Sequence, residues 1–204
     1  MKRIALLAFL ALALPLAAFG DSIDTTNSGG TLAGSTAGMT LTGSLLIAVN
    51  GLNGLGLVTG NDLGSVSFST GALMAGGSLQ MGGAFAAGGS FTITGNGTSG
   101  IPNGAIFSGT FSGPATWTLV TLANGTHSYT LTGAVAGALG SGFHTEGVTV
   151  QLTINTGRGF FNGTTTISSG DTNIVTSVPE PGTLGLLGTG LVGIAGAMHR
   201  KFKS

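Results

Sequence analysis

Residues 148–155 alternate strictly between apolar and polar side chains, and this pattern limits what the chain can fold into. The apolar positions are Val148, Val150, Leu152 and Ile154. Because successive side chains of a β-strand point to opposite faces of a sheet, a period of two predicts a strand with one buried and one exposed face. A chain with such segments has to form a sheet that covers its apolar side.

An Asn-Gly turn joins two further segments of this kind. Residues 116–122 and 126–135 flank the dipeptide Asn124-Gly125. Asn-Gly favours the positive φ angles of a tight hairpin turn, so the two segments are predicted to pair. The side chains expected to share the buried face of this hairpin are Trp117, Leu119, Tyr129 and Leu131.

Shorter alternating runs cover most of the chain between residues 39 and 178. They predict strands at 39–49, 55–59, 65–70, 78–81, 90–94, 105–112, 164–168 and 173–177. Further Asn-Gly turns begin at residues 50, 53, 96, 103 and 162. Since no run of helical period occurs between them, the pattern predicts an all-β fold, an antiparallel sandwich or barrel of short strands with Asn-Gly hairpins.

A β-solenoid is the alternative all-β architecture. Thr-x-Thr pairs recur, beginning at residues 40, 92, 116, 130 and 164. The intervals between these pairs differ, whereas a solenoid needs a fixed period. The sandwich or barrel is therefore the preferred prediction.

Glycine makes up 40 of the 204 residues, which raises the question of disorder. Disordered chains are rich in charge and poor in β-branched and aromatic residues, whereas only 6% of this chain is charged. A packed β-rich domain is therefore predicted for residues 39–178, after a flexible segment at 21–38. The chain has no cysteine, so packing and strand pairing must supply its stability.

Residues 1–20 have the layout of a secretory signal peptide. Lys2 and Arg3 precede an apolar run at 4–14, and small residues follow at Ala18 and Gly20. Signal peptidase recognises this order of basic, apolar and small-residue regions. Cleavage is predicted after Gly20, with Ala18 as an alternative. An uncleaved anchor is the other interpretation, but the apolar run is short for a membrane span.

Residues 179–204 combine a short motif, an apolar run at 183–198 and a basic tail at 199–204. The motif consists of Pro179, Glu180 and Pro181. The apolar run would form a transmembrane helix about 24 Å long, which is short for a hydrocarbon core of about 30 Å. By the positive-inside rule the tail should stay cytoplasmic, because it carries Arg200, Lys201 and Lys203.

This arrangement resembles the PEP-CTERM sorting signal of exported proteins in Gram-negative bacteria. In that family a Pro-Glu-Pro motif precedes a membrane-spanning helix and an Arg-rich end, and the membrane transpeptidase exosortase recognises the motif and removes the tail. The resemblance implies an inner-membrane precursor that is delivered to the cell surface or the extracellular matrix of exopolysaccharide-producing bacteria. The tail departs from the family pattern, because Arg200 is its only arginine.

The charges of the exported part exclude several classes of partner. Between residues 21 and 178 the only Lys or Arg is Arg158, and the acids are Asp21, Asp24, Asp62, Glu146 and Asp171. Nucleic acids and anionic lipids require a basic surface, which this composition does not offer. A surface of Thr, Ser and Asn instead suits polysaccharide, ordered water or like chains, or is inert.

Groups for catalysis or metal binding are sparse in the sequence. His144 and Glu146 form a His-x-Glu pair in a predicted loop, and His127 follows an Asn-Gly turn, but no cluster of metal ligands accompanies them. A G-x-S-x-G nucleophile elbow is absent as well. We therefore interpret the His-x-Glu pair as part of a surface loop and expect a non-enzymatic protein without metal or cofactor.

Three functional classes follow from the sequence. The first is a non-enzymatic surface or matrix protein associated with exopolysaccharide. The second is an ice- or carbohydrate-binding module that uses Thr-rich strand faces, since some ice-binding proteins carry this type of C-terminal segment. Thr-x-Thr pairs aligned on adjacent strands would support it. The third is a hydrolase, for which His127, His144 or Glu146 would have to converge with another polar group in a cleft.

Overall fold

The computed structural model describes residues 22–142 and 145–176, which form one antiparallel sheet of twelve strands. The strands are β1 (Ser22–Ser28), β2 (Thr31–Ser35), β3 (Gly38–Asn50), β4 (Val58–Ser69), β5 (Gly83–Phe85), β6 (Gly88–Asn96), β7 (Asn103–Phe111), β8 (Ala115–Thr121), β9 (His127–Leu139), β10 (Thr145–Gly157), β11 (Thr164–Thr166) and β12 (Ser169–Thr176). Among the described residues the helical structure is one 3-10 turn, η1 (Leu52–Gly54). The prediction of an all-β antiparallel fold is confirmed.

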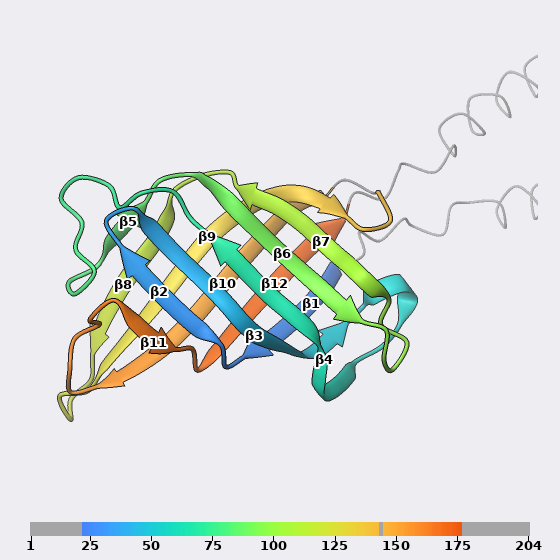
Figure 1. Ribbon diagram of the computed structural model, residues 1–204, viewed down its shortest axis with the longest axis horizontal. Helices are drawn as coiled ribbons and strands as arrows, with labels where there is room; N and C mark the ends of the chain where they lie inside the picture. Colours follow the sequence, from blue (N-terminus) through green and yellow to red (C-terminus); the bar gives the residue numbers. More distant parts are fainter. Residues whose placement is uncertain (1–21, 143–144, 177–204) are drawn as a thin grey trace, which may run out of the picture. The chain divides into compact units, whose positions relative to one another are not determined.

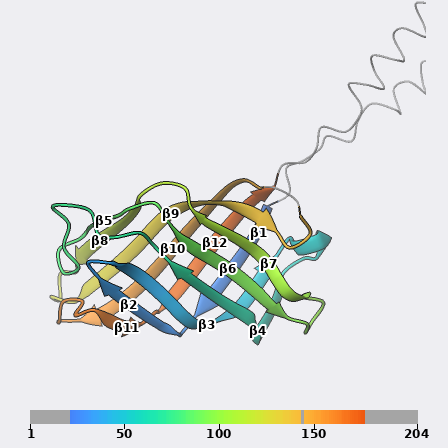
Figure 2. The same cartoon turned by 45° about the horizontal axis from the view of Figure 1, so that its top comes forward.

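The sheet closes on itself because β1 pairs along both of its edges. Thr25 of β1 lies opposite Thr172 of β12 on one side and opposite Val49 of β3 on the other. The ring therefore runs β1–β12–β10–β9–β7–β6–β4–β3 and returns to β1. Figures 1 and 2 show these tilted strands wrapping around a common interior. Of the two architectures predicted, the barrel is the one that forms.

In two places, two consecutive short strands pair with the same long strand. β1 and β2 both pair with β3, and β7 and β8 both pair with β9. Gly29 and Gly30 separate β1 from β2, and both have positive φ. A Cβ at Gly30 would lie 2.5 Å from the backbone nitrogen of Ser44, so glycine is required there. Such glycine breaks bend the wall and help it to close.

The interior is filled by side chains from alternate strand positions. On β10 the residues Val148, Val150, Leu152 and Ile154 are all at most 4% exposed. The largest fully buried side chains are Trp117, Tyr129, Phe85, Phe91, Phe107, Phe111 and Phe161. A barrel of about eight strands has an interior that side chains can fill, so this one is a packed core.

Two local predictions are confirmed by this arrangement. The alternating residues 148–155 lie within β10, with their apolar side chains inside. The Asn-Gly hairpin forms from β8 and β9, in a register that places Trp117 opposite Leu131 and Leu119 opposite Tyr129. The rings of Trp117 and Tyr129 stack with their centroids 4.9 Å apart.

The expectation of a flexible segment at residues 21–38 needs correction. Ser22–Ser28 forms β1, the strand that closes the ring, and Thr31–Ser35 forms β2. Both strands accordingly belong to the compact unit that contains the other described strands. The apolar alternation was not visible because two of the inward residues on β1, Thr25 and Asn27, are polar.

Three strand predictions between residues 55 and 81 also need correction. Residues 78–81 form a turn, in which the Ser78 hydroxyl accepts hydrogen bonds from the backbone N–H groups of Gln80 and Met81. The segments predicted at 55–59 and 65–70 contribute to a single strand, β4. A register shift interrupts its pairing with β3, near the point where the Gly64 N–H donates to Asp62 Oδ1 at 3.1 Å.

Candidate functional site

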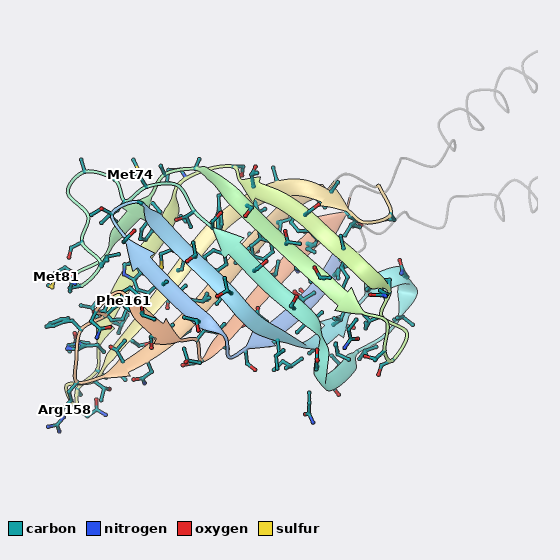
Figure 3. The ribbon with its side chains drawn as sticks, viewed as in Figure 1. Met74, Met81, Arg158 and Phe161 are labelled. Carbon is teal, nitrogen blue, oxygen red and sulfur yellow. The ribbon has the colours of Figure 1, made fainter. Side chains whose placement is uncertain are left out.

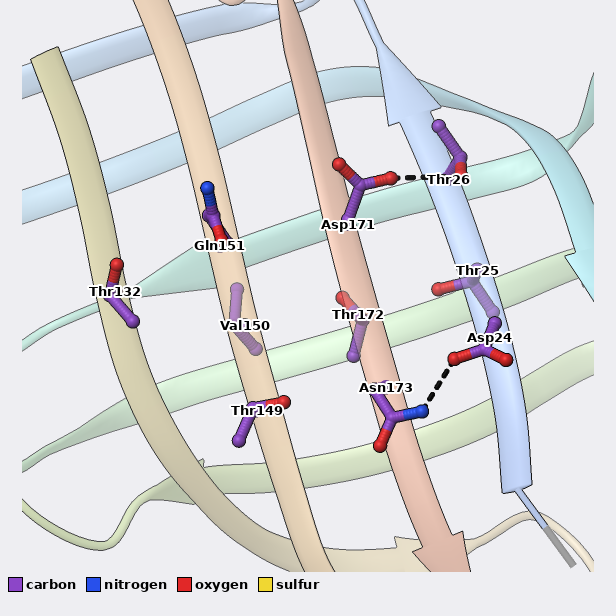
Figure 4. Close-up of a pocket in the computed structure, with 10 residues that line it drawn as sticks. All are labelled: Asp24, Thr25, Thr26, Thr132, Thr149, Val150, Gln151, Asp171, Thr172 and Asn173. Atoms are coloured by element: carbon purple, nitrogen blue, oxygen red, sulfur yellow. Dashed lines mark hydrogen bonds between the residues drawn. The ribbon is translucent and has the colours of Figure 1, made fainter.

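The outward faces of β9, β10, β12 and β1 form a continuous polar surface (Figure 4). Two rows of polar side chains cross these strands in register. From β9 to β1, the first row contains Thr132, Gln151, Asp171 and Thr26. From β10 to β1, the second row contains Thr149, Asn173 and Asp24. The strands thus bring carboxylates, amides and hydroxyls from distant parts of the chain onto one surface.

Two hydrogen bonds tie β12 to β1 within this surface. The Thr26 hydroxyl donates to Asp171 Oδ1 at 2.9 Å, and Asn173 Nδ2 donates to Asp24 Oδ1 (Figure 4). The side chains surround an open hollow of about 290 Å³, which we call the polar hollow. Its lining consists of Asp24, Thr25, Thr26, Thr132, Thr149, Val150, Gln151, Asp171, Thr172 and Asn173. Its volume lies at the low end of small-molecule sites, about 300–1,000 Å³.

Beside the polar hollow, β8 and β9 align two Thr-x-Thr pairs. Thr116 lies opposite Thr132, and Thr118 lies opposite Thr130. All four occupy outward positions, and Thr130 alone is half-buried. On the next strand Gln151 lies beside Thr132, so a longer side chain interrupts the array. The alignment expected of an ice- or carbohydrate-binding face therefore occurs on one pair of strands.

His127 lies within the predicted strand segment 126–135, and the structure places it in a strand. It is the first residue of β9 and only 8% exposed. Its Nδ1 lies 3.0 Å from Thr121 Oγ1, and its ring stacks on Phe160 with centroids 4.3 Å apart. These contacts bury the ring at the turn end of the β8–β9 hairpin. Glu146 belongs to β10, so the loop predicted for the His-x-Glu pair is wrong at this residue. His144 and the side chain of Glu146 lie outside the described part of the chain, so their distance from His127 is not defined.

One end of the barrel carries exposed apolar side chains (Figure 3). Met74, Met81 and Phe160 are 45%, 67% and 49% exposed. Figure 3 shows the two methionines and Arg158 at this end, away from the first residues of β1 and the last of β12. The exposed Phe160 contrasts with its neighbour Phe161, which is buried.

Hydrogen bonds from core side chains hold the loop that carries Met74 and Met81. Trp117 Nε1 donates to the Leu79 carbonyl at 2.9 Å, and the Tyr129 hydroxyl donates to the Gln80 carbonyl at 2.8 Å. The Phe161 N–H donates in turn to the Tyr129 hydroxyl at 3.1 Å. The exposed methionines therefore sit on a loop held by two buried aromatic side chains.

The residues predicted to direct export and sorting all lie outside the described residues. They are Ala18, Gly20, Pro179, Glu180, Pro181, Arg200, Lys201 and Lys203. The predicted transmembrane helix at 183–198 also lies there. Within residues 22–142 and 145–176, no helix is long and apolar enough to cross a membrane. The same residues contain no group of three or more His, Cys, Asp or Glu placed to hold a metal ion.

Comparison with known proteins informs the part of the chain beyond β12. Residues 177–201 match the family model for the PEP-CTERM protein-sorting motif. Comparisons with curated proteins and with solved structures give no match. The matched segment contains the Pro-Glu-Pro motif and Arg200, on which the resemblance was based, and none of the twelve strands. The chain thus carries a PEP-CTERM sorting motif, which marks an exported protein targeted to exosortase.

Proposed function

We propose that this protein is processed at residues 179–181 and remains at the cell surface or in the extracellular matrix, where its barrel contacts exopolysaccharide without catalysis. The observation that carries this proposal is the sorting motif at residues 177–201, because it directs a protein to exosortase and hence outward. Signal peptidase would remove the first segment after Gly20. Arg200, Lys201 and Lys203 would hold the tail on the cytoplasmic side until cleavage.

The outer surface of the barrel supports contact with polysaccharide. Its outward positions on β9, β10 and β12 are mainly hydroxyl and amide side chains. Hydroxyls and amides both donate and accept hydrogen bonds, as sugar hydroxyls do. Arg158 is the one Lys or Arg in the part of the chain that the structure describes, so contacts there depend little on positive charge. Many weak contacts along a polymer add up through effective concentration.

The hydrolase alternative has weak support from the geometry. Thr121 Oγ1 and His127 Nδ1 lie 3.0 Å apart, which is the spacing of a nucleophile and its base. A hydrolase also needs a third group to orient the base, and none of the hydrogen bonds of the described residues reaches the other nitrogen of His127. Stacking on Phe160 accounts for the position of the ring. We therefore keep the non-enzymatic role as the proposal.

Ice binding is a second candidate because of the aligned threonines Thr116, Thr118, Thr130 and Thr132. An ice-binding face has to be flat over several strands, whereas the wall of a closed barrel curves. If the protein binds ice, it should shape growing ice crystals, and Thr118→Leu with Thr132→Leu should abolish this. Failure of the purified protein to shape ice or to produce thermal hysteresis would remove this candidate.

Replacement of Pro179, Glu180 and Pro181 by alanine tests the processing step. In cells with the export machinery, the intact mass of the wild type should show that both end segments have been removed. The protein should be found at the surface or in the matrix. The alanine variant should keep its tail and stay in the inner-membrane fraction. Thr183→Ala, which changes a neighbouring position and leaves the motif intact, is the control and should behave as the wild type.

Co-fractionation of the processed protein with the polysaccharide of its own cells tests the second half of the proposal. Enzymatic removal of the polysaccharide should release the protein into the soluble fraction. Unchanged mass and location of the alanine variant would overturn the sorting role. Retention of the protein at the surface after polysaccharide removal would overturn the association with polysaccharide.

A further inference from the structure

The two carboxylates of the polar hollow are held in place and lack a cationic partner. Asp24 accepts a hydrogen bond from Asn173, and Asp171 accepts one from Thr26, in each case through Oδ1. The hydrogen bonds of the described residues leave the second oxygen of each carboxylate unused. Arg158, the one Lys or Arg in residues 22–142 and 145–176, lies in the loop after β10 and does not line the hollow. The hollow is therefore a negatively charged surface.

The strand register places the two carboxylates close together. Asp24 lies opposite Asn173 and Asp171 lies opposite Thr26, so the two acids are diagonal neighbours on β1 and β12. Diagonal neighbours on paired antiparallel strands lie about 7–8 Å apart. Two negative charges at that distance repel each other, and a cation between them is attracted by both. A single ammonium group can thus reach both side chains.

The remaining lining supplies groups that bind hydroxyls. Gln151 and Asn173 carry amides that donate and accept, and Thr132 and Thr149 add hydroxyls on the β9–β10 side. Thr25 and Thr172 complete the lining. Each is 2% exposed, and neither hydroxyl oxygen has a hydrogen-bond partner among the described residues. Both hydroxyls are buried on the inward side of the wall, whereas Asp24 and Asp171 point outward, so a ligand in the hollow would contact the outward side chains alone.

We propose that the polar hollow binds a protonated amino sugar within a glycan, with the ammonium group between Asp24 and Asp171. The amides and threonine hydroxyls would contact the ring hydroxyls on either side. This inference rests on the proposed association with polysaccharide and names the class of sugar that is recognised. Uronic acids would be repelled by the two carboxylates, and neutral sugars would leave the charges uncompensated.

Calorimetric titration of the full chain, purified in mild detergent, tests the inference. The probe is a fully deacetylated glucosamine oligomer at a mildly acidic pH at which its amines are protonated. We expect it to bind more tightly than the N-acetylated oligomer and than an oligogalacturonate. Because one exposed charge pair contributes at most about fivefold in affinity, Asp171→Asn and Asp24→Asn should each weaken binding by about that factor. Raising the salt concentration should weaken it further.

Asp62→Asn is the matched control, because it makes the same change of charge on β4, outside the hollow. It should bind the glucosamine oligomer as the wild type does, and the unfolding midpoints of all three variants should agree. Equal binding of spermidine would mean attraction of charge without recognition of sugar, and it would overturn the inference. So would equal affinity for the N-acetylated oligomer, no binding at all, or an Asp62→Asn effect as large as that of Asp171→Asn.

The two proposals fail in distinguishable ways. If the glucosamine oligomer does not bind but the processed protein still co-fractionates with polysaccharide, the amino-sugar site is wrong and the proposed surface role stands. If Asp24 and Asp171 bind the oligomer but the protein does not co-fractionate with the polysaccharide of its own cells, the amino-sugar site stands and the proposed function is wrong.

Discussion

Two sectors of the barrel wall differ in what they hold inside. The aromatic sector packs the side chains of Phe68, Phe91, Phe107, Phe111, Trp117, Tyr129 and Phe161. The hydroxyl sector, around β1 and β12, buries Thr25, Asn27, Ser44 and Thr172 instead. Aromatic side chains bury far more apolar area than threonine does. The aromatic sector therefore contributes more to stability. The hydroxyl sector buries less apolar area, and it carries the polar hollow on its outer face.

The polar contacts of the two sectors also differ. In the aromatic sector the polar atoms of Trp117 and Tyr129 both find backbone partners in the loop at 79–80. In the hydroxyl sector Asn27 Nδ2 donates to Ser44 Oγ at 2.7 Å, but the hydroxyls of Thr25 and Thr172 have no partner among the described residues. If this comparison is right, truncation of Trp117 or Tyr129 should destabilise the barrel, whereas removal of the hydroxyls of Thr25 and Thr172 should stabilise it.

Truncation of Trp117 should have the largest effect. Trp117→Ala removes a side chain that is 1% exposed and stacks on Tyr129, and it frees the Leu79 carbonyl. We expect a loss of about 3–5 kcal/mol in the free energy of unfolding. Urea unfolding followed by circular dichroism measures it, because Trp117 is the one tryptophan and cannot serve as its own probe. Thr118→Ala, an exposed neighbour on β8, should stay within about 0.5 kcal/mol of the wild type.

Tyr129→Phe should have an intermediate effect. The hydroxyl donates to Gln80 and accepts from the Phe161 N–H, so its removal leaves both backbone groups unpaired. A loss of about 1–3 kcal/mol is expected from buried groups left without partners. Hydrogen exchange should show faster exchange of the Phe161 amide. A variant with wild-type stability and unchanged exchange would mean that water takes over both bonds and that the loop is held by packing alone.

Thr25→Val and Thr172→Val should have the smallest effects, and these should be stabilising. Each replacement keeps the shape of the side chain and removes a buried hydroxyl without a partner among the described residues. We expect a gain of up to about 1 kcal/mol per site in urea unfolding. Asn27→Leu is the contrasting variant, since it breaks the bond to Ser44 and should destabilise. A clear loss of stability in both valine variants would show that these hydroxyls are satisfied by water.

The strands were predictable where inward residues are apolar, and the closure of the barrel was not predictable. In β10 every second residue of 148–154 is apolar, so the local period was sufficient. In β1 the inward residues are Ile23, Thr25 and Asn27, and two polar residues of three erase that period. The partner of β1 lies far away in the chain, because Asp24 and Asn173 are 149 residues apart. Strand order over such a distance cannot be read from local patterns.

The candidate site shows the same division. The sorting motif is a contiguous sequence signal, so residues 179–181 could be recognised directly, and the family model matches them. The polar hollow combines residues of four strands, and no pattern in the sequence links Asp24 to Asp171. The burial of His127 has a related cause, because its ring stacks on Phe160, which follows β10. Contacts between distant segments decide which polar residues become neighbours.

The pairing of β1 with β12 also determines when the domain can finish folding. Ser22 lies opposite Val175, so the first described strand finds its final partner only after almost the whole chain has been translocated. Contacts of such high sequence separation form slowly, and until then β1 has an open edge that can pair with other chains. A mature barrel has lost that edge and can open it again only by breaking the ring, which favours slow unfolding once the barrel has formed.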